Sequence, residues 1–206
     1  MTKSFCHHAT IPSDMMDIID ADLTKTFDPQ MATSKLMGDQ TILEKRNSLN
    51  AWVPTTYWIG GLIWHYFQRA NDEFFHYDLD QIDGESMQYT KYELNQHYDW
   101  HQDEGLGSLY KPQAGGNRGG ELVVQDWVNN GCERVRKLSC SLQLSHEDDY
   151  EGGGTQVRDV DNSMVTLPKG RGSLFFFDSR LQHRAMTVKK GLRKSLISWA
   201  VGPRWK

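Results

Sequence analysis

Hydrophobic residues near the start of the chain recur at the spacing of an amphipathic helix. From Met15 to Phe27 they fall three or four positions apart, which places them on one face of a helix. The segment 12–14, Pro-Ser-Asp, comes directly before this run and is typical of a helix start. We therefore expect a first helix that packs its apolar face on a sheet.

A second stripe of large apolar side chains predicts another helix over residues 54–67, with Pro54 in its first turn. Gly60 and Gly61 weaken helix propensity within it. Two adjacent glycines indicate either close packing against a neighbour or an interruption of the helix.

After these helices the pattern changes to short runs with the alternation of β-strands. Residues 1–10 resemble a frayed end or a short edge strand, 28–51 are polar and irregular, and 80–84 form a turn cluster. We expect strands at 74–79, 86–94, 136–145, 155–160, 174–177, 183–188 and 193–199. The chain is thus predicted to be an α+β protein that is mainly β.

The predicted strand 136–145 alternates leucine and cysteine with serine and glutamine. Its apolar face belongs in a core, and its polar face, with Ser141 and Gln143, is suited to line a site for a charged small molecule. The alternative is a polar face in contact with solvent, which is common in antiparallel sheets.

Residues 104–120 are rich in glycine and poor in apolar side chains. Such a stretch indicates either a mobile lid over a site or a surface insertion. A short strand is expected just after it, over 121–125.

Two residues of metal-ligand type precede this stretch. His101 and Asp103 are two positions apart in a strand-like segment, so their side chains are expected on the same face. A third ligand from a distant strand would complete the two-histidine, one-carboxylate set that holds non-haem Fe(II), and His183 is the candidate.

The order and spacing of further motifs extend this pattern from Met87 to Val201. They are Tyr92, Tyr98-x-x-His101-x-Asp103, Tyr150-Glu151-Gly152-Gly153, Gly170-x-Gly172-Ser173-Leu174, His183, and Arg193 ten residues later. In these motifs the chain resembles the 2-oxoglutarate/Fe(II)-dependent dioxygenases of the prolyl 4-hydroxylase type. The resemblance implies a double-stranded β-helix, or jelly roll, with N-terminal helices packed on one sheet.

The resemblance also implies roles for particular residues. Fe(II) would be bound by His101, Asp103 and His183, with 2-oxoglutarate and O₂ as co-substrates and ascorbate as a further cofactor. Contacts to 2-oxoglutarate are implied for four residues: Arg193, Ser195, Tyr92 and Gln143. Strand parity independently favours Arg193 over Lys194, because Arg193 shares a face with Ser195, and an arginine fork suits a carboxylate.

Length, charge and cysteine content limit the setting of this site. With 206 residues and 38% hydrophobic content, the chain is expected to form one domain, in which 1–74 give helical support and 75–206 the jelly-roll core. The net charge of −4 disfavours a nucleic-acid partner. Three cysteines without paired spacing and no long apolar segment favour a soluble, cytoplasmic protein without a membrane partner.

The substrate implied first by the resemblance is a prolyl residue of a peptide or protein, hydroxylated at an unactivated C–H bond. A free amino acid or another small molecule is the alternative, followed by a non-catalytic jelly-roll binding module. A nucleic-acid demethylase of the same superfamily usually has a second arginine six residues after the first, where this chain has Trp199. A zinc hydrolase could use the same ligand types but would not need Arg193.

Overall fold

The computed structural model describes residues 6–34, 42–82, 87–104, 134–159, 161–203 and 205. Its α-helices are α1 (Ser13–Phe27) and α2 (Trp58–Ala70), and short helical turns span η1 (Asp28–Gln30), η2 (Asn71–Phe75) and η4 (Glu147–Asp149). The strands of the first half are β1 (Cys6–Thr10), β2 (Ala32–Thr33), β3 (Arg46–Asn47), β4 (Leu49–Val53), β5 (Gln81–Ile82), β6 (Met87–Tyr92) and β7 (His97–His101). The strands of the second half are β8 (Arg134–Gln143), β9 (Tyr150–Gly152), β10 (Thr155–Arg158), β11 (Met164–Thr166), β12 (Ser173–Asp178), β13 (His183–Ala185), β14 (Val188–Gly191) and β15 (Arg193–Pro203).

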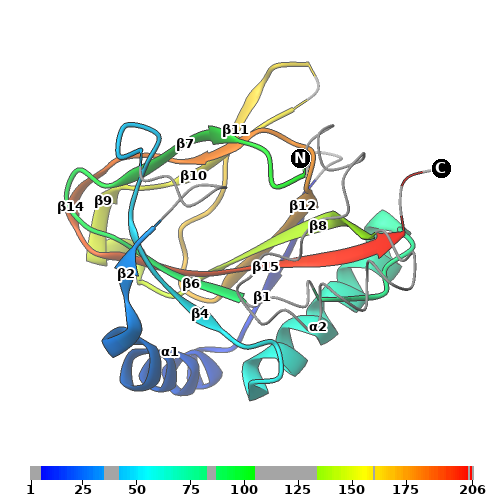
Figure 1. Cartoon of the computed structure of the whole chain (residues 1–206), viewed down its shortest axis with the longest axis horizontal. Helices are drawn as coiled ribbons and strands as arrows, with labels where there is room; N and C mark the ends of the chain where they lie inside the picture. The colour runs from blue at the N-terminus through cyan, green and yellow to red at the C-terminus, as the bar shows by residue number, and fades with distance from the viewer. Residues whose placement is uncertain are drawn as a thin grey trace.

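Two antiparallel sheets of different size lie opposite each other (Figure 1). Among the described strands, the larger sheet has the order β1-β12-β8-β15-β6-β4-β2, with β5 added beside β15. The smaller sheet has the order β11-β10-β13-β7-β3, and β14 pairs with β9 at one end. This is the predicted jelly roll of an α+β, mainly β protein.

Helices α1 and α2 cover the outer face of the larger sheet (Figure 1). Alternation along β8 sends Leu138, Cys140 and Leu142 outward into this main core, where they are at most 1% exposed. The intervening Ser139, Ser141 and Gln143 are buried too, but they face the smaller sheet. Both faces of β8 are therefore buried, and the space between the sheets is lined by polar side chains.

The second helix begins later than the pattern predicts. Tyr57 precedes it and the helix runs to Ala70, beyond the predicted end at residue 67. A β-carbon on Gly60 would lie 2.0 Å from the carbonyl oxygen of Thr55, so close backbone packing explains this glycine. A β-carbon on Gly61 would meet no described atom within 4 Å outside its own helix backbone, so close packing does not explain this second glycine.

The predicted strand over 74–79 is wrong. The chain forms a π-helical turn to Phe75 and reverses at His76, whose φ of 55° is left-handed. Asn71 then fixes the segment, because its side chain bonds both the N–H and the carbonyl of Tyr77 at 2.8 and 2.9 Å. Side-chain bonds to the backbone have overridden the alternating pattern.

Three other boundaries differ from the prediction. The interval 28–51, expected to be irregular, contains β2, β3 and the start of β4, and the turn cluster 80–84 contains β5. The strand predicted over 183–188 is divided into β13 and β14, because Met186 bonds to Gly154 and leaves the ladder with β7. The predicted strand 155–160 ends at Arg158, and a turn follows.

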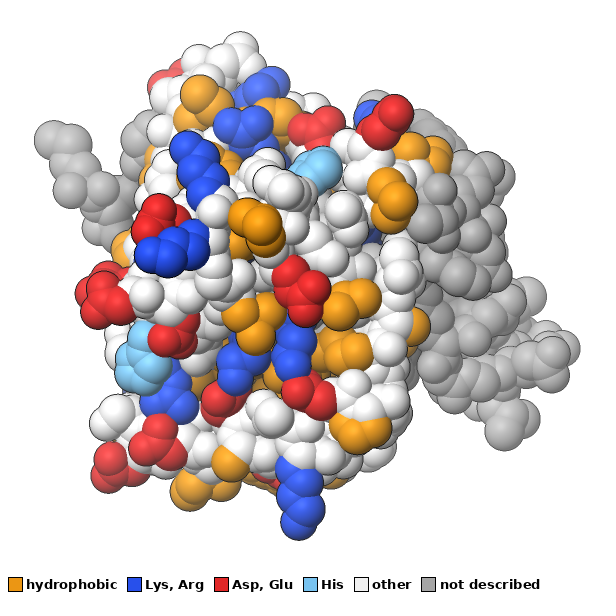
Figure 2. Space-filling view, turned by 90° about the vertical axis from the view of Figure 1, so that its left-hand side faces the viewer, with side chains coloured by type: hydrophobic (Ala, Val, Ile, Leu, Met, Phe, Trp, Pro, Cys, Tyr) orange, Lys and Arg blue, Asp and Glu red, His pale blue; other side chains and the backbone are white. Residues whose placement is uncertain are grey.

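The glycine-rich stretch 105–120 and the expected strand 121–125 lie outside the described residues. Within the described part of the chain, no helix has both the length and the apolar character needed to cross a membrane. On the side of the molecule that carries β9 and β14, basic, acidic and hydrophobic side chains are interspersed, without an extended basic area (Figure 2).

Candidate active site

His101, Asp103 and His183 converge between the two sheets. Each offers one ligand-type atom, and these atoms all lie within 4.8 Å of one another. The two histidines are opposite each other in the pairing of β7 with β13. Asp103 was expected on the same strand as His101, but β7 ends at His101 and the aspartate lies in the bend that follows.

A β-bulge in β7 sets the direction of His101. The register of β7 against β13 shifts between His183 and Ala185, so that Tyr98 and His101 occupy successive positions on the inner face. Their rings stack with centroids 3.5 Å apart. The guanidinium of Arg46 lies 4.6 Å from the centre of the Tyr98 ring, which completes a stack behind the histidine.

Backbone carbonyls fix both imidazole rings. Nδ1 of His101 bonds the carbonyl oxygen of Asp99 at 2.8 Å, and Nδ1 of His183 bonds that of Leu181 at 3.0 Å. A carbonyl accepts only, so each Nδ1 carries the proton and donates it. Each Nε2 is therefore directed at Asp103, with distances of 3.8 Å from His101 and 3.4 Å from His183 to its two carboxylate oxygens. Ligand histidines in metal sites are held in this way.

Two serines position the carboxylate. Ser139 donates a hydrogen bond of 2.6 Å to Oδ2 of Asp103, and its hydroxyl also lies 3.0 Å from that of Ser179. The N–H of Asp103 bonds the carbonyl of Ser179 at 3.0 Å. Sequence reasoning placed Ser139 only on the polar face of its strand and did not connect it to Asp103.

The three titratable groups are coupled. Burial and the nearby His183 lower the pKa of His101 to about 3, so this ring is neutral. Burial also opposes charge on Asp103 and His183, but their mutual attraction and hydrogen bond lower the pKa of Asp103 and raise that of His183. The site thus combines a neutral imidazole, a carboxylate and an imidazole that holds a proton until another cation displaces it.

The four residues predicted to contact the co-substrate lie together between the sheets, apart from the three ligand-type residues. Arg193 is 2% exposed, pairs with Tyr92 in the ladder and has its guanidinium 5.2 Å from the centre of that ring. It donates to Oε1 of Gln143 at 3.3 Å and to the hydroxyl of Thr155 at 2.9 Å, and so connects the two sheets. Ser195 is opposite Gln143 in the pairing with β8. Lys194 faces the other way and bonds Asp20 of α1.

Among the residues that the structure describes, two buried hydroxyl groups near Arg193 lack a hydrogen-bond partner. They belong to Ser195, which is 0% exposed, and to Tyr150, which is 3% exposed. Burial raises the pKa of Tyr150, while the charge of Arg193 and the approach of its guanidinium N–H groups to the phenol oxygen lower it, so the phenol lies beside the guanidinium but its own O–H has no acceptor among the described residues. A buried hydroxyl without a partner is costly, so the arrangement is suited to an anion that accepts from all three groups. Tyr150 was not predicted as a contact, although it opens the Tyr-Glu-Gly-Gly motif.

Trp199 provides a further unsatisfied donor at the level of the metal ligands. It is opposite Ser139 in the sheet and 5% exposed, and within the described part of the chain its indole N–H has no hydrogen-bond partner. The guanidinium of Arg136 lies 3.9 Å from its ring centre. The charge of Arg136 also contributes to the low pKa of Asp103.

Comparison with known proteins places the chain in a family. The model of the 2OG-Fe(II) oxygenase superfamily matches residues 87–201, which is more than half of the chain. The chain belongs to the 2OG-Fe(II) oxygenase superfamily, and is therefore a dioxygenase whose family implies Fe(II), 2-oxoglutarate and O₂. The match contains all three ligand-type residues and the group around Arg193. No curated protein sequence matches significantly.

Solved structures of prolyl hydroxylases have the same fold. A Pseudomonas putida prolyl-4-hydroxylase gives a TM-score of 0.69 at 14% identity, covering 98% of this chain and 94% of its own. A prolyl hydroxylase from Trichoplax adhaerens, solved with a peptide fragment of the hypoxia inducible factor oxygen degradation domain, gives 0.68 at 13% identity, covering 96% and 84%. The viral collagen prolyl hydroxylase of Paramecium Bursaria Chlorella virus-1, solved with 2OG, gives 0.60 at 16% identity and 97% of both chains.

Proposed function

We propose that this dioxygenase hydroxylates a prolyl residue within a peptide or protein. The proposal rests first on the convergence of His101, Asp103 and His183 in a superfamily whose members use Fe(II) and 2-oxoglutarate. Prolyl hydroxylases are among the solved structures with the same fold, and one of them was solved with a peptide. At identities of 13–16% they support the substrate class only as a proposal.

The donor set fits a ferrous ion. Two imidazole Nε2 atoms and one carboxylate form the facial set that leaves positions open for other ligands. We assign Fe(II) to His101, Asp103 and His183; when bound, the ion supplies the activation of O₂ that side chains alone cannot provide. The protein's part is to keep both Nδ1 atoms protonated and to orient Asp103 through Ser139.

The group around Arg193 fits the far carboxylate of 2-oxoglutarate. Arg193 is held by Gln143 and Thr155, so its fork is oriented before any ligand arrives. The unpartnered hydroxyls of Ser195 and Tyr150 would each donate to the same carboxylate. Tyr92 contributes a ring beside the guanidinium and has the weaker claim to a direct contact.

Trp199 supports a substrate with a carbonyl group. Its buried indole N–H lacks an acceptor, and its strand position is opposite the serine that holds Asp103. A peptide carbonyl next to the reacting residue would satisfy this donor. A free amino acid could do so with its carboxylate, so this contact alone does not separate the two substrate classes.

The deciding experiment measures succinate formation by the purified protein with Fe(II), ascorbate and 2-oxoglutarate. Proline-containing peptides, free amino acids and no substrate are compared, and each candidate is examined by mass spectrometry. We expect peptides to stimulate succinate formation and to gain one oxygen. Stimulation by free amino acids alone would overturn the peptide proposal and leave the family assignment intact.

Three expectations from the sequence are part of this proposal. They are a single domain over residues 1–206, ascorbate as a cofactor and a cytoplasmic location. A peptide or protein partner, in preference to nucleic acid, is part of the same proposal.

A further inference from the structure

The smaller sheet has a second face, directed away from the metal site. Alternation along β10 and β13 buries Val157 and His183 on the inner side and leaves Gln156, Arg158 and Arg184 partly exposed on the other. Trp100 directly precedes His101 in β7, so the same alternation places its side chain on this outer face. The outer face therefore combines residues from three adjacent strands.

Two arginines share the ring of Trp100. The guanidinium carbon of Arg158 lies 4.5 Å from the ring centre and that of Arg184 lies 4.7 Å from it. Arg184 is also oriented by two bonds to Oε1 of Gln156, at 2.9 and 2.7 Å. We refer to Trp100, Arg158 and Arg184 as the Trp100 cluster.

Neither guanidinium of the Trp100 cluster has a direct carboxylate partner among the described residues. Among the residues that the structure describes, neither Arg158 nor Arg184 forms an ion pair with a carboxylate, and Arg158 has no hydrogen bond from its side chain. Other arginines of this protein do have such partners, as Arg171 has in Asp17 and Arg134 in Asp80. Two like charges on one ring repel each other, and a carboxylate bridging them would relieve that repulsion.

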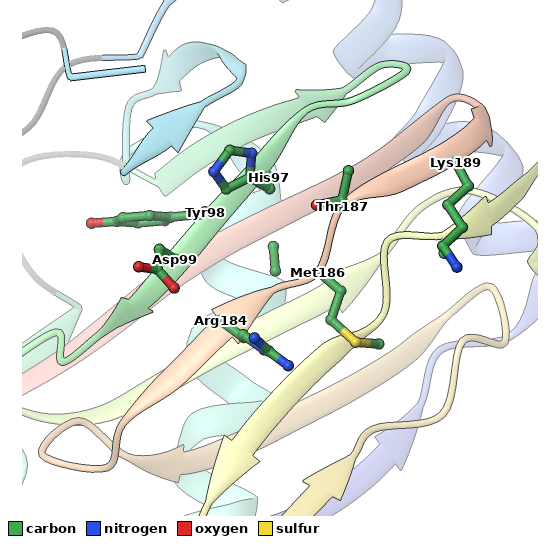
Figure 3. A pocket seen from close by; sticks show the side chains of 9 residues that line it. His97, Tyr98, Asp99, Arg184, Met186, Thr187 and Lys189 are labelled. Atoms are coloured by element: carbon green, nitrogen blue, oxygen red, sulfur yellow. The ribbon is translucent and has the colours of Figure 1, made fainter. Parts of the chain in front are cut away.

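A pocket of about 440 Å³ extends the surface from Arg184 (Figure 3). Arg184 and Met186 project into it beside Asp99, and Thr187 and Lys189 line its other side. It holds two cations and one carboxylate, together with a flexible thioether that adapts to apolar side chains. Met164, which is 57% exposed, is opposite Arg158 in the pairing of β10 with β11.

We propose that the outer face of β10, β13 and β7 is a docking site for an acidic peptide segment of a partner protein. Carboxylate side chains would bind the forks of Arg158 and Arg184, and an adjacent apolar side chain would enter the pocket next to Met186. A nucleic acid is disfavoured because the cations are few and Asp99 lies among them, whereas a phosphate backbone needs a longer basic track. The site is separate from the metal ligands, which occupy the opposite face of the same strands.

The test uses the full chain and a short fluorescein-labelled peptide that alternates glutamate with leucine. Fluorescence anisotropy should show binding that weakens as salt is added, and a matched peptide with glutamine in place of glutamate should bind at least about tenfold more weakly. The double variant Arg158→Gln/Arg184→Gln should lose about tenfold in affinity for the acidic peptide. The double variant Arg158→Lys/Arg184→Lys retains the charge but not the planar fork. Its affinity for the acidic peptide should lie between that of the unmodified protein and that of the double glutamine variant.

Lys190→Gln is the matched control, because Lys190 follows Lys189 but pairs with Glu151 and does not line the pocket. It removes one positive charge and should leave peptide affinity unchanged. Co-substrate turnover without peptide should be the same in all these variants, which separates this site from the proposed hydroxylase function. Equal peptide binding by the double glutamine variant, or no binding of the acidic peptide to the folded protein, would overturn the proposal. Tighter binding of a short oligothymidylate through the same arginines would overturn it in favour of nucleic acid.

Discussion

The space between the two sheets has a metal end, at His101, Asp103 and His183, and an Arg193 end. The polar groups at these two ends differ in how far they are hydrogen-bonded. At the metal end, His183 and Asp103 form a charged pair, and backbone carbonyls accept from the Nδ1 atoms of both histidines. At the Arg193 end, the guanidinium has partners, but the hydroxyls of Ser195 and Tyr150 have none.

This difference follows from the ligand that each end is suited to receive. A metal ion replaces a proton, so a histidine–aspartate pair can remain satisfied before the ion arrives. A carboxylate brings only acceptors, so a site for it must consist of donors that are incomplete without it. Substitutions at the two ends should therefore have separable effects, on metal affinity at one and on co-substrate affinity at the other.

The largest effect is expected from His183→Ala. This change removes one of three ligands and leaves Asp103 buried without its main partner. We expect loss of Fe(II) binding, measured by equilibrium dialysis, and loss of succinate formation. His65→Ala on the exposed side of α2 is the control and should behave like the unmodified protein. Activity close to normal in His183→Ala would remove His183 from the ligand set.

The next effect is expected from Arg193→Ala. Loss of a buried, doubly hydrogen-bonded guanidinium should raise the half-saturating 2-oxoglutarate concentration by about tenfold or more, because charge-assisted bonds are lost. Metal affinity should change little. Lys194→Ala is the control, since that side chain points to α1 and bonds Asp20. A larger co-substrate effect in Lys194→Ala would reverse the assignment.

The separation of the two ends was partly predictable from sequence. Spacing singled out His101 and Asp103, although Asp103 lies in the bend after β7 and not on the strand as expected, and strand parity correctly turned Arg193 inward and Lys194 outward. The position of Tyr150 near Arg193 depends on how β9 closes against β14, which no local pattern specifies. The role of Ser139 likewise depends on the bend that carries Asp103 across to β8.

The inward position of Tyr98 could not be predicted for a related reason. Strict alternation from His101 places Tyr98 on the outer face, whereas the bulge turns it inward to stack on His101. A bulge adds one residue to one strand and depends on its partner, so the sequence of β7 alone does not reveal it. The prediction of a strand over 74–79 was wrong because side-chain hydrogen bonds, which the alternating pattern does not show, determine that segment: Asn71 bonds the backbone of Tyr77.

Acid should weaken metal binding through the protonation of His183. The pKa of His183 is raised above its ordinary 6.5 by Asp103, so its proton must leave when a metal binds. Metal affinity should therefore fall as the pH drops through the raised pKa of His183, by up to about tenfold per unit. His101, with a pKa of about 3, adds nothing in this range.

The number of protons released distinguishes this arrangement from two ordinary histidines. Calorimetric titration of the full chain with Mn²⁺, in buffers of different ionisation enthalpy at pH 6, should show release of about one proton per ion. Release of two protons would contradict the low pKa of His101. A co-substrate affinity that follows the same pH curve without metal would contradict the separation of the two ends.

The smallest effect, and the sharpest test of the Arg193 end, is expected from Tyr150→Phe. The change removes one hydroxyl that has no partner, so the free protein should lose no stability and its Tm should stay the same or rise slightly. The half-saturating 2-oxoglutarate concentration should nevertheless rise, by roughly three- to tenfold, because one donor to the carboxylate is lost. A residue with a purely structural role would show the opposite combination. Tyr66→Phe on α2 is the control and should change neither quantity; a Tyr150→Phe protein that is less stable yet unchanged in its 2-oxoglutarate requirement would remove Tyr150 from the co-substrate site.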